Sequence, residues 1–366
     1  MYANAANSIC MIIYLRHLHF IRRFALYTQY QKCMAIIGKT NIHEGLQVYP
    51  IKYPWAKELY DQAVSNTWFP HEIQLGEDLA DWSKMTDEER HAVTFFMSYF
   101  NPAELLVNKS LAFGVYPYVS AAEAHLYLAK QMWEEANHSV AFEYVMQTFP
   151  INRDEAFNAH RATETMRKKE DYNILYLKRM TEQTLDIDTI EGKRDFVRNL
   201  VATNVIMEGI WFYSGFMVGL SFRQRGLLRN FASLIDWVVR DESLHLKFGI
   251  NLILTILEEK PEVIDEAFTQ EIYDMILVAV ELETVYNKDL MPNGILGLNA
   301  DYINQYVKYM ADRRLEELGF SPHYNVSNPA KWMATANDVH QLVNFFEATN
   351  TAYEVDARAH TEKKNY

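Results

Sequence analysis

WEEANHSVAF (residues 133–142) and VVRDESLHLKF (residues 238–248) are two mostly apolar segments that each place a glutamate three residues before a histidine. The two pairs are Glu135 with His138 and Glu242 with His245. Positions i and i+3 lie on one face of a helix, so both side chains of a pair can reach the same point. Each segment therefore offers one carboxylate and one imidazole to a common binding site.

A single glutamate in another apolar segment precedes each pair: Glu104 in NPAELLV and Glu208 in VIMEGIW. Burying unpaired carboxylates would cost several kcal/mol each, and a pair of dications is the simplest compensation. Four carboxylates and two imidazoles from four helices form the ligand set of dinuclear carboxylate sites in helical bundles. Such a ligand set suits iron and manganese. The predicted metal ligands are Glu104, Glu135, His138, Glu208, Glu242 and His245.

The segment EERH (residues 88–91) serves as an internal control because it has the same Glu-x-x-His spacing. It lies in a charged turn beside Thr86 and Glu89, which form the pattern of a capping box at the start of a helix. We therefore expect Glu88 and His91 to face solvent and to bind no metal.

Composition favours helices along the whole chain. Of the 366 residues only 13 are Gly and 10 are Pro, and 49% are hydrophobic. We predict an all-α fold, a ferritin-like helical bundle with a dinuclear metal site in its core. Helices are expected after Thr86 and over about 120–148, 153–183, 193–220, 225–257, 261–290 and 299–318.

The sequence pattern divides the chain into three parts. Residues 34–320 are the predicted ferritin-like metal-binding domain, and residues 321–366, where the periodicity is lost, are a predicted C-terminal tail for docking to a partner. Residues 1–33 differ in composition and are interpreted as an N-terminal extension that need not belong to the functional chain. Met34 is then an alternative start, and an amphipathic membrane-surface helix is the minor alternative.

Charge and cysteine content argue against several classes of function. The formal net charge of −13 argues against a nucleic-acid-binding surface. No segment reaches the roughly 20 apolar residues that span a bilayer, so no membrane partner is expected. The two cysteines, Cys10 and Cys33, leave no disulfide framework in the main body, which fits a reducing cytoplasm. A reaction that needs a cysteine must take it from another chain.

Over about residues 45–320 the chain resembles the small (β) subunit of class I ribonucleotide reductase. The resemblance rests on the six ligand positions and on the string RDESLH (residues 240–245), which matches the family's DE(A/S)LH motif. It implies that Trp68, in NTWFP, and Asp241 form an electron-transfer relay with the ligand His138. It also implies that Tyr353, which follows a similar FFE segment, is the tail tyrosine of the electron path to the large (α) subunit.

Phe142 stands where the common subgroup of this family carries its radical tyrosine, four residues after the first ligand histidine. Phenylalanine has no phenol that can lose a proton and an electron. Tyr144 points roughly 200° around the helix from Phe142 and cannot replace it. With four glutamate ligands, the chain resembles class Ic, in which O2 oxidises a Mn/Fe pair and the high-valent manganese is the stored oxidant. Di-iron and dimanganese pairs remain alternatives.

The class Ic resemblance implies that Phe212, Phe216 and Val238 line an apolar pocket beside the metals, although ordinary core packing accounts for them equally well. The implied activity is that of the oxidant-generating small subunit of ribonucleoside-diphosphate reductase, a cytoplasmic homodimer. Its O2-activated centre would start a thiyl radical on a cysteine of the large (α) subunit, and that radical would begin the reduction of ribonucleotides to deoxyribonucleotides.

Two other functions fit part of the pattern. The Mn/Fe ligand-binding oxidases of the same superfamily carry a tyrosine five residues before the third carboxylate ligand, where this chain has Thr203. A ferritin-like metal-binding protein would have no need of Trp68 or Asp241. Both alternatives predict a protein that works without a large subunit.

Overall fold

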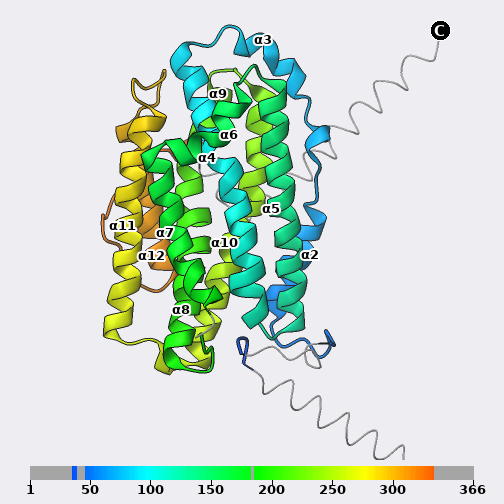
Figure 1. The fold of residues 1–366 in the computed structure, drawn as a ribbon, viewed down its shortest axis with the longest axis vertical. Helices are drawn as coiled ribbons and strands as arrows, with labels where there is room; N and C mark the ends of the chain where they lie inside the picture. Colours follow the sequence, from blue (N-terminus) through cyan, green and yellow to red (C-terminus); the bar gives the residue numbers. More distant parts are fainter. Residues whose placement is uncertain (1–34, 39–45, 183–184, 334–366) are drawn as a thin grey trace, which may run out of the picture.

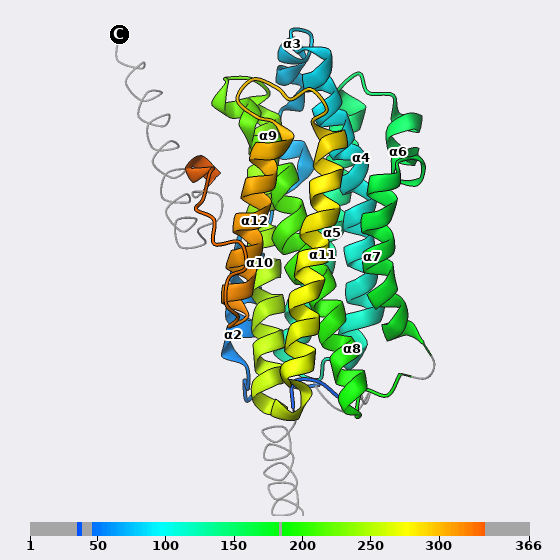
Figure 2. The same cartoon turned by 90° about the vertical axis from the view of Figure 1, so that its left-hand side faces the viewer.

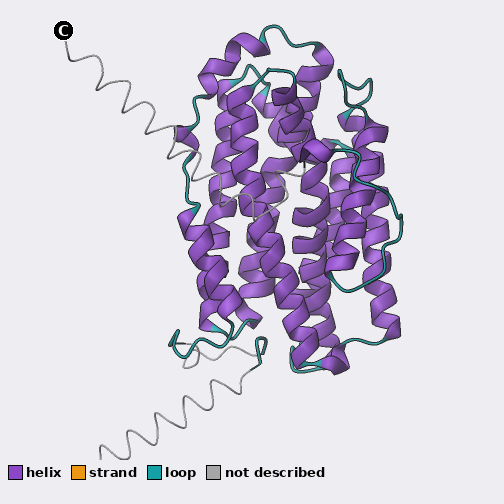
Figure 3. Ribbon diagram, turned by 180° about the vertical axis from the view of Figure 1, so that it is seen from behind, coloured by secondary structure: helices purple, strands orange, loops and turns teal. Residues whose placement is uncertain are grey.

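The computed structural model describes residues 35–38, 46–182 and 185–333, and these residues form a bundle of helices (Figure 1). No β-strand occurs among the described residues, as Figure 3 shows. The α-helices are α2 (Pro54–Ser65), α3 (Leu79–Trp82), α4 (Asp87–Lys109), α5 (Ala122–Thr148), α6 (Arg153–Ala162), α7 (Glu164–Thr181), α8 (Ile190–Leu200), α9 (Phe212–Gln224), α10 (Arg229–Glu259), α11 (Glu266–Leu290) and α12 (Ala300–Glu317). The prediction of an all-α bundle is confirmed.

The predicted helix starts and ends agree closely with the structure where capping residues mark them. Thr86 and Glu89 form the expected capping box, and α4 begins at the next residue after Thr86. Asp265 and Asn299 accept backbone hydrogen bonds at the starts of α11 and α12. The expected helix over 153–183 is instead two helices, because Thr163 is extended (φ −89°, ψ 118°) between α6 and α7.

The core of the bundle consists of α4, α5, α10 and the long stretch Ile190–Gln224, which pack against one another. The stretch is continuous, but its middle, η5 (Val201–Trp211), is a π-helix rather than the α-helix that the sequence predicted. Every residue of η5 is buried. A π-helical turn holds more residues than an α-helical turn, so side chains after residue 201 are rotated relative to the expected register.

The stretch Ile190–Gln224 is also long and apolar enough to cross a membrane, contrary to the expectation from the sequence. Its most apolar window is wholly buried inside the protein, however, as in the core helix of a globular protein. In Figures 1 and 2, α7, α11 and α12 lie on one side of the bundle, and they pack against this central stretch.

Residues 321–333 pack along the bundle rather than leaving it. The backbone N–H groups of His323 and Tyr324 both donate to Oδ1 of Asp312 at 2.8 Å. The Tyr302 hydroxyl donates to the Pro329 carbonyl at 2.8 Å. The N-terminal extension (1–33) and the tail tyrosine Tyr353 lie outside the described residues.

Candidate metal centre

The six predicted ligands converge in the middle of the bundle, and each of them is fully buried. They come from four elements: Glu104 from α4, Glu135 and His138 from α5, Glu208 from η5, and Glu242 and His245 from α10. They form two groups of four whose possible ligand atoms all lie within 4.8 Å of one another. The first group is Glu104, Glu135, His138 and Glu242, and the second is Glu135, Glu208, Glu242 and His245.

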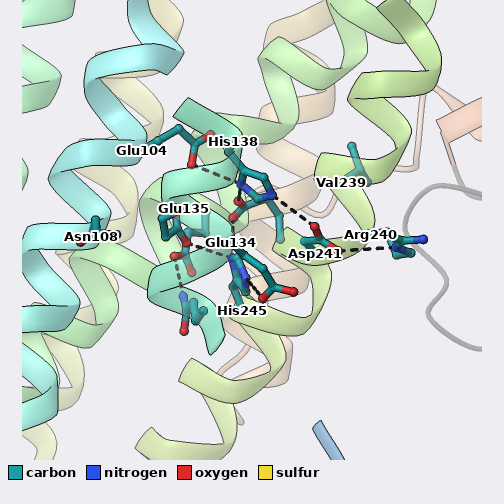
Figure 4. A network of polar contacts seen from close by, with 12 residues as sticks. Glu104, Asn108, Glu134, Glu135, His138, Val239, Arg240, Asp241 and His245 are labelled. Atoms are coloured by element: carbon teal, nitrogen blue, oxygen red, sulfur yellow. Dashed lines mark hydrogen bonds and ion pairs between the residues drawn. The ribbon is translucent and has the colours of Figure 1, made fainter. Parts of the chain in front are cut away.

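Glu135 and Glu242 belong to both groups, which is the arrangement of carboxylates that bridge two metal ions. Nδ1 of His138 lies 3.1 Å from Oε1 of Glu242 and 3.5 Å from Oε2 of Glu104. Nδ1 of His245 lies 3.0 Å from Oε1 of Glu135 and 3.4 Å from Oε2 of Glu242. Each imidazole thus turns the same nitrogen towards the shared carboxylates (Figure 4).

The ligand atoms that face one another have no hydrogen-bond partners. Both carboxylate oxygens of Glu104, Glu135 and Glu242, and Nδ1 of both histidines, are buried without one. Buried polar groups are normally satisfied, so this cluster of orphaned atoms calls for an explanation. A pair of dications bound among them would supply it, and oxygen with imidazole is the donor set of iron and manganese sites. The residues present therefore fit a dinuclear metal site.

The electrostatics of the cluster agree with this interpretation. Burial, together with the neighbouring Glu242 and Glu135 carboxylates, raises the pKa of Glu104 well above its usual range. The same causes raise the pKa of Glu208. Carboxylates packed this closely in a buried site are costly as anions. Bound cations would favour the ionised carboxylates and offset that cost.

The outer nitrogen of His138 faces Asp241, whose Oδ2 lies 3.2 Å from Nε2. The same oxygen accepts a 2.6 Å hydrogen bond from Nε1 of Trp68. Nε of Arg240 lies 3.5 Å from the other Asp241 oxygen, and its guanidinium also donates to the Asn66 carbonyl. The structure thus joins Trp68 and His138 through Asp241, three residues that lie far apart in the sequence.

The outer nitrogen of His245 has a carboxylate partner that the sequence analysis missed. Nε2 of His245 lies 3.0 Å from Oε2 of Glu134, and Oε1 of Glu134 pairs with Nζ of Lys130 at 3.1 Å. Metal-bound histidines usually donate their second N–H to a carboxylate, which fixes the tautomer and orients the ring. The sequence signal was the first glutamate of WEEANH, which directly precedes Glu135.

Glu208 is held by two amide side chains that the sequence analysis also missed. Nε2 of Gln131 donates to its Oε1 at 3.0 Å, and Nδ2 of Asn204 donates to its Oε2 at 2.7 Å. Gln131 lies one turn before Glu135 on α5, so its spacing was a usable signal. Asn204 precedes Glu208 by four residues, a spacing at which helical side chains are neighbours, so it was a usable signal as well.

Phe142 lies in an apolar cluster with the predicted pocket residues. Its ring centroid is 5.6 Å from that of Phe100, which also contacts Phe212 at 4.6 Å and Phe216 at 5.5 Å. These rings and Val238 are fully buried. The position one turn after His138 carries a benzyl side chain, which has no phenol.

Three further residues lie where the sequence analysis expected them. Tyr144 donates its hydroxyl to the Ile73 carbonyl at 3.2 Å and is only partly buried. Glu88 and His91 are exposed, and the His91 ring contacts the Asp289 carbonyl. Among the described residues, Glu88 and His91 belong to neither of the two groups that could hold a metal ion.

Sequence comparisons place these features in a known context. The family model for the small chain of ribonucleotide reductase matches residues 45–329. The chain is 37% identical over 310 residues to the ribonucleoside-diphosphate reductase subunit beta of Chlamydia pneumoniae, covering 84% of this chain and 90% of that protein. It is 30% identical over 312 residues to the ribonucleoside-diphosphate reductase small subunit of Dictyostelium discoideum, covering 84% and 85%.

Solved structures share the fold. A ribonucleotide reductase R2 subunit from Clostridium botulinum superimposes with a TM-score of 0.72 at 28% identity, over 78% of this chain and 89% of that one. The dimanganese(II)-NrdF of Streptococcus sanguinis gives a TM-score of 0.69 at 20% identity, over 81% and 99%, and supports the fold alone. The ferritin-like bundle expected from the sequence is confirmed.

Proposed function

Because this chain belongs to the ribonucleotide reductase small-chain family, we propose that it is an oxidant-generating small subunit whose centre holds one manganese and one iron ion. The family's small subunits work with a large subunit that binds the nucleotide. Di-iron and dimanganese centres are the alternatives to the Mn/Fe pair.

One observation carries the proposal: a complete dinuclear ligand set lies beside a phenylalanine at the usual radical position. Five of the six ligands leave buried oxygen or nitrogen atoms without a hydrogen-bond partner, and bound cations would satisfy them. Phe142 is fully buried and cannot be oxidised to a phenoxyl radical. An oxidising equivalent therefore has to be stored on the metals rather than on this side chain, which favours the Mn/Fe chemistry of class Ic.

When bound, the metal pair supplies a one-electron oxidant after its reaction with O2. The protein's part is to hold and orient the path by which an electron reaches it. Asp241 accepts hydrogen bonds that fix both the Trp68 indole and the His138 imidazole. Trp68 is almost fully buried, with its ring 5.4 Å from that of Trp237, so water is kept away from the path.

The electron would come from the large (α) subunit through Tyr353 and Trp68, leaving a thiyl radical on a cysteine of the large subunit. Tyr353 lies outside the described residues, and its role rests on the family resemblance. The main body of this chain has no cysteine after Cys33, which fits a division of labour in which the large subunit supplies the thiol. A homodimeric small subunit in the cytoplasm is part of the same proposal.

The test is to assay ribonucleoside-diphosphate reduction with the large subunit and to record the EPR spectrum of the active protein. We expect activity without a tyrosyl-radical signal. A stable tyrosyl signal whose intensity tracks activity would contradict the storage of the oxidant on the metals. Activity without the large subunit would favour the oxidase alternative instead, although Thr203 there is buried and bonded to Ser110 rather than being a tyrosine.

A further inference from the structure

Each of the two histidine ligands is connected to a tryptophan through a carboxylate, but the two connections differ in charge. On the His138 side, Asp241 accepts the indole hydrogen bond of Trp68 directly. On the His245 side, Glu134 contacts the imidazole and forms an ion pair with Lys130, whose ammonium lies over the face of the Trp133 ring. The proposed function uses only the first connection.

The second connection is compact because its three outer residues share one face of α5. Lys130, Trp133 and Glu134 stand at positions i, i+3 and i+4. Nζ of Lys130 is 3.1 Å from Oε1 of Glu134 and 3.9 Å from the centroid of the Trp133 ring. The ammonium is buried and has no other hydrogen-bond partner. The ammonium therefore interacts with this carboxylate and with this ring.

Trp133 is the nearest part of this connection to solvent. Trp133 is 38% exposed, and its ring centroid lies 5.9 Å from that of Phe69 in an edge-to-face arrangement. Phe69 directly follows Trp68 in the sequence. A tryptophan so placed could deliver an electron from the surface to the oxidised centre. Such delivery would waste the stored oxidant, because no nucleotide would be reduced.

The charged groups in direct contact with the two indoles have opposite signs, a carboxylate at Trp68 and an ammonium at Trp133. Removing an electron leaves a positive charge on the indole, which the Asp241 carboxylate beside Trp68 stabilises. The ammonium above Trp133 attracts the neutral ring but repels the ring once it is positive. Among the described residues, no lysine or arginine lies over the face of the Trp68 ring. Oxidation is thus favoured at Trp68 and opposed at Trp133.

We propose that Lys130 is a positioning residue that keeps Trp133 from being oxidised and so confines electron transfer to the Trp68 side. This inference rests on the proposed function, since it concerns the direction in which the oxidised centre draws its electron. The reaction that Lys130 prevents is the oxidation of Trp133. The Trp133 indole would lose one electron to the O2-oxidised centre and its N–H proton to water, and the neutral indole radical would then react with O2.

The experiment is to oxidise the full-length protein, loaded with manganese and iron, with O2 in the absence of the large subunit. The lifetime of the oxidised centre is followed by its absorption, and oxidised tryptophans are mapped by peptide mass spectrometry. Lys130→Met and Lys130→Gln are compared with Lys130→Arg, which keeps the charge. Lys168→Met is the matched control, since it removes an exposed i,i+4 ion pair with Glu164 on α7.

We expect the oxidised centre of Lys130→Met and Lys130→Gln to decay at least roughly tenfold faster than in the unmodified protein, with new oxygen adducts on Trp133. Lys130→Arg and Lys168→Met should behave like the unmodified protein. Adding Trp133→Phe to Lys130→Met should restore the lifetime. A merely structural effect through Glu134 and His245 would persist in that double variant.

The results separate this inference from the proposed function. If the unmodified protein forms its oxidised centre and the Lys130 variants neither shorten its lifetime nor oxidise Trp133, the inference is wrong and the proposed function stands. A short lifetime that Trp133→Phe does not restore overturns the inference as well. If the unmodified protein forms no oxidised centre with any metal pair, the proposed function fails and the inference fails with it.

Discussion

Nε1 of Trp68 donates a 2.6 Å hydrogen bond to Oδ2 of Asp241, although 173 residues separate them in the chain. The same oxygen lies 3.2 Å from Nε2 of the ligand His138. One carboxylate oxygen therefore orients both the metal-side imidazole and the buried indole. Burial raises the pKa of Asp241 and the hydrogen bond from His138 lowers it, and the net effect is a lowered pKa. Asp241 therefore stays an anion that can accept both hydrogen bonds.

Asp241→Asn tests this shared oxygen. The amide keeps the size of the side chain and one acceptor oxygen but loses the negative charge, so it holds the imidazole and the indole by weaker hydrogen bonds. We expect nucleotide reduction to fall by about 10–100-fold, the usual effect of losing such an outer partner. Metal content should stay near that of the unmodified protein. Full activity in Asp241→Asn would contradict the relay.

Glu135→Ala tests the ligand assignment, because Glu135 belongs to both four-residue groups. Removing a bridging carboxylate takes a ligand from both metals at once, and we expect neither metal to be retained after gel filtration. Elemental analysis measures the result. Glu88→Ala is the control, since it has the same sequence spacing on an exposed turn and should bind metal normally. Full metal content in Glu135→Ala would show that the ligands lie elsewhere.

Lys169→Met tests a buried ion pair on α7, a helix whose many charged residues are typical of a solvent-facing segment. Lys169 and Glu283 are both fully buried, with Nζ 2.5 Å from Oε2, and Nζ also lies 3.7 Å from the centre of the Tyr99 ring. Removing one partner leaves Glu283 unpaired, which typically costs about 3–5 kcal/mol. Urea denaturation should show this loss, and adding Glu283→Gln should recover part of it. An unchanged free energy of unfolding would contradict the account.

Glu170→Gln tests a carboxylate that destabilises the fold at neutral pH. Burial, and then the charge of Asp171, raises the pKa of Glu170 to about 7. Between the pKa of Glu170 in the unfolded chain and its higher pKa in the folded protein, the folded state binds more protons. The free energy of unfolding therefore falls as the pH rises towards 7, because the buried side chain has to ionise. The neutral glutamine should raise the free energy of unfolding by roughly 1 kcal/mol at pH 8, a value reduced for partial exposure, and by nothing at pH 4. Equal effects at both pH values would contradict this assignment.

The sequence predicted that the six candidate ligands would come together because its signals are local. Glu135 with His138 and Glu242 with His245 are helical neighbours, so their spacing alone places them together. One partner that orients Glu208 is local as well, because Asn204 precedes it by four residues. The other partner, Gln131, reaches Glu208 across the interface between two helices, and its spacing from Glu135 does not show that contact.

Lys169 shows the same limit for the fold. The segment around it is highly charged, which favours a solvated face, and most of its charged residues do face solvent. Lys169 is the exception because Glu283, Tyr99 and Tyr286 from two other helices surround its ammonium. Contacts between helices that are distant in sequence decide its burial, and hydrophobic periodicity does not record them.

The measurement that tests the central claim most directly is the manganese and iron content per chain of protein activated with both metals and O2, alongside nucleotide reduction with the large subunit. The account predicts about one manganese and one iron per chain, with activity that rises and falls with both. Full activity in protein that contains iron alone would contradict the Mn/Fe centre and leave a di-iron reductase. Protein that binds neither metal would contradict the assignment of the buried carboxylate cluster itself.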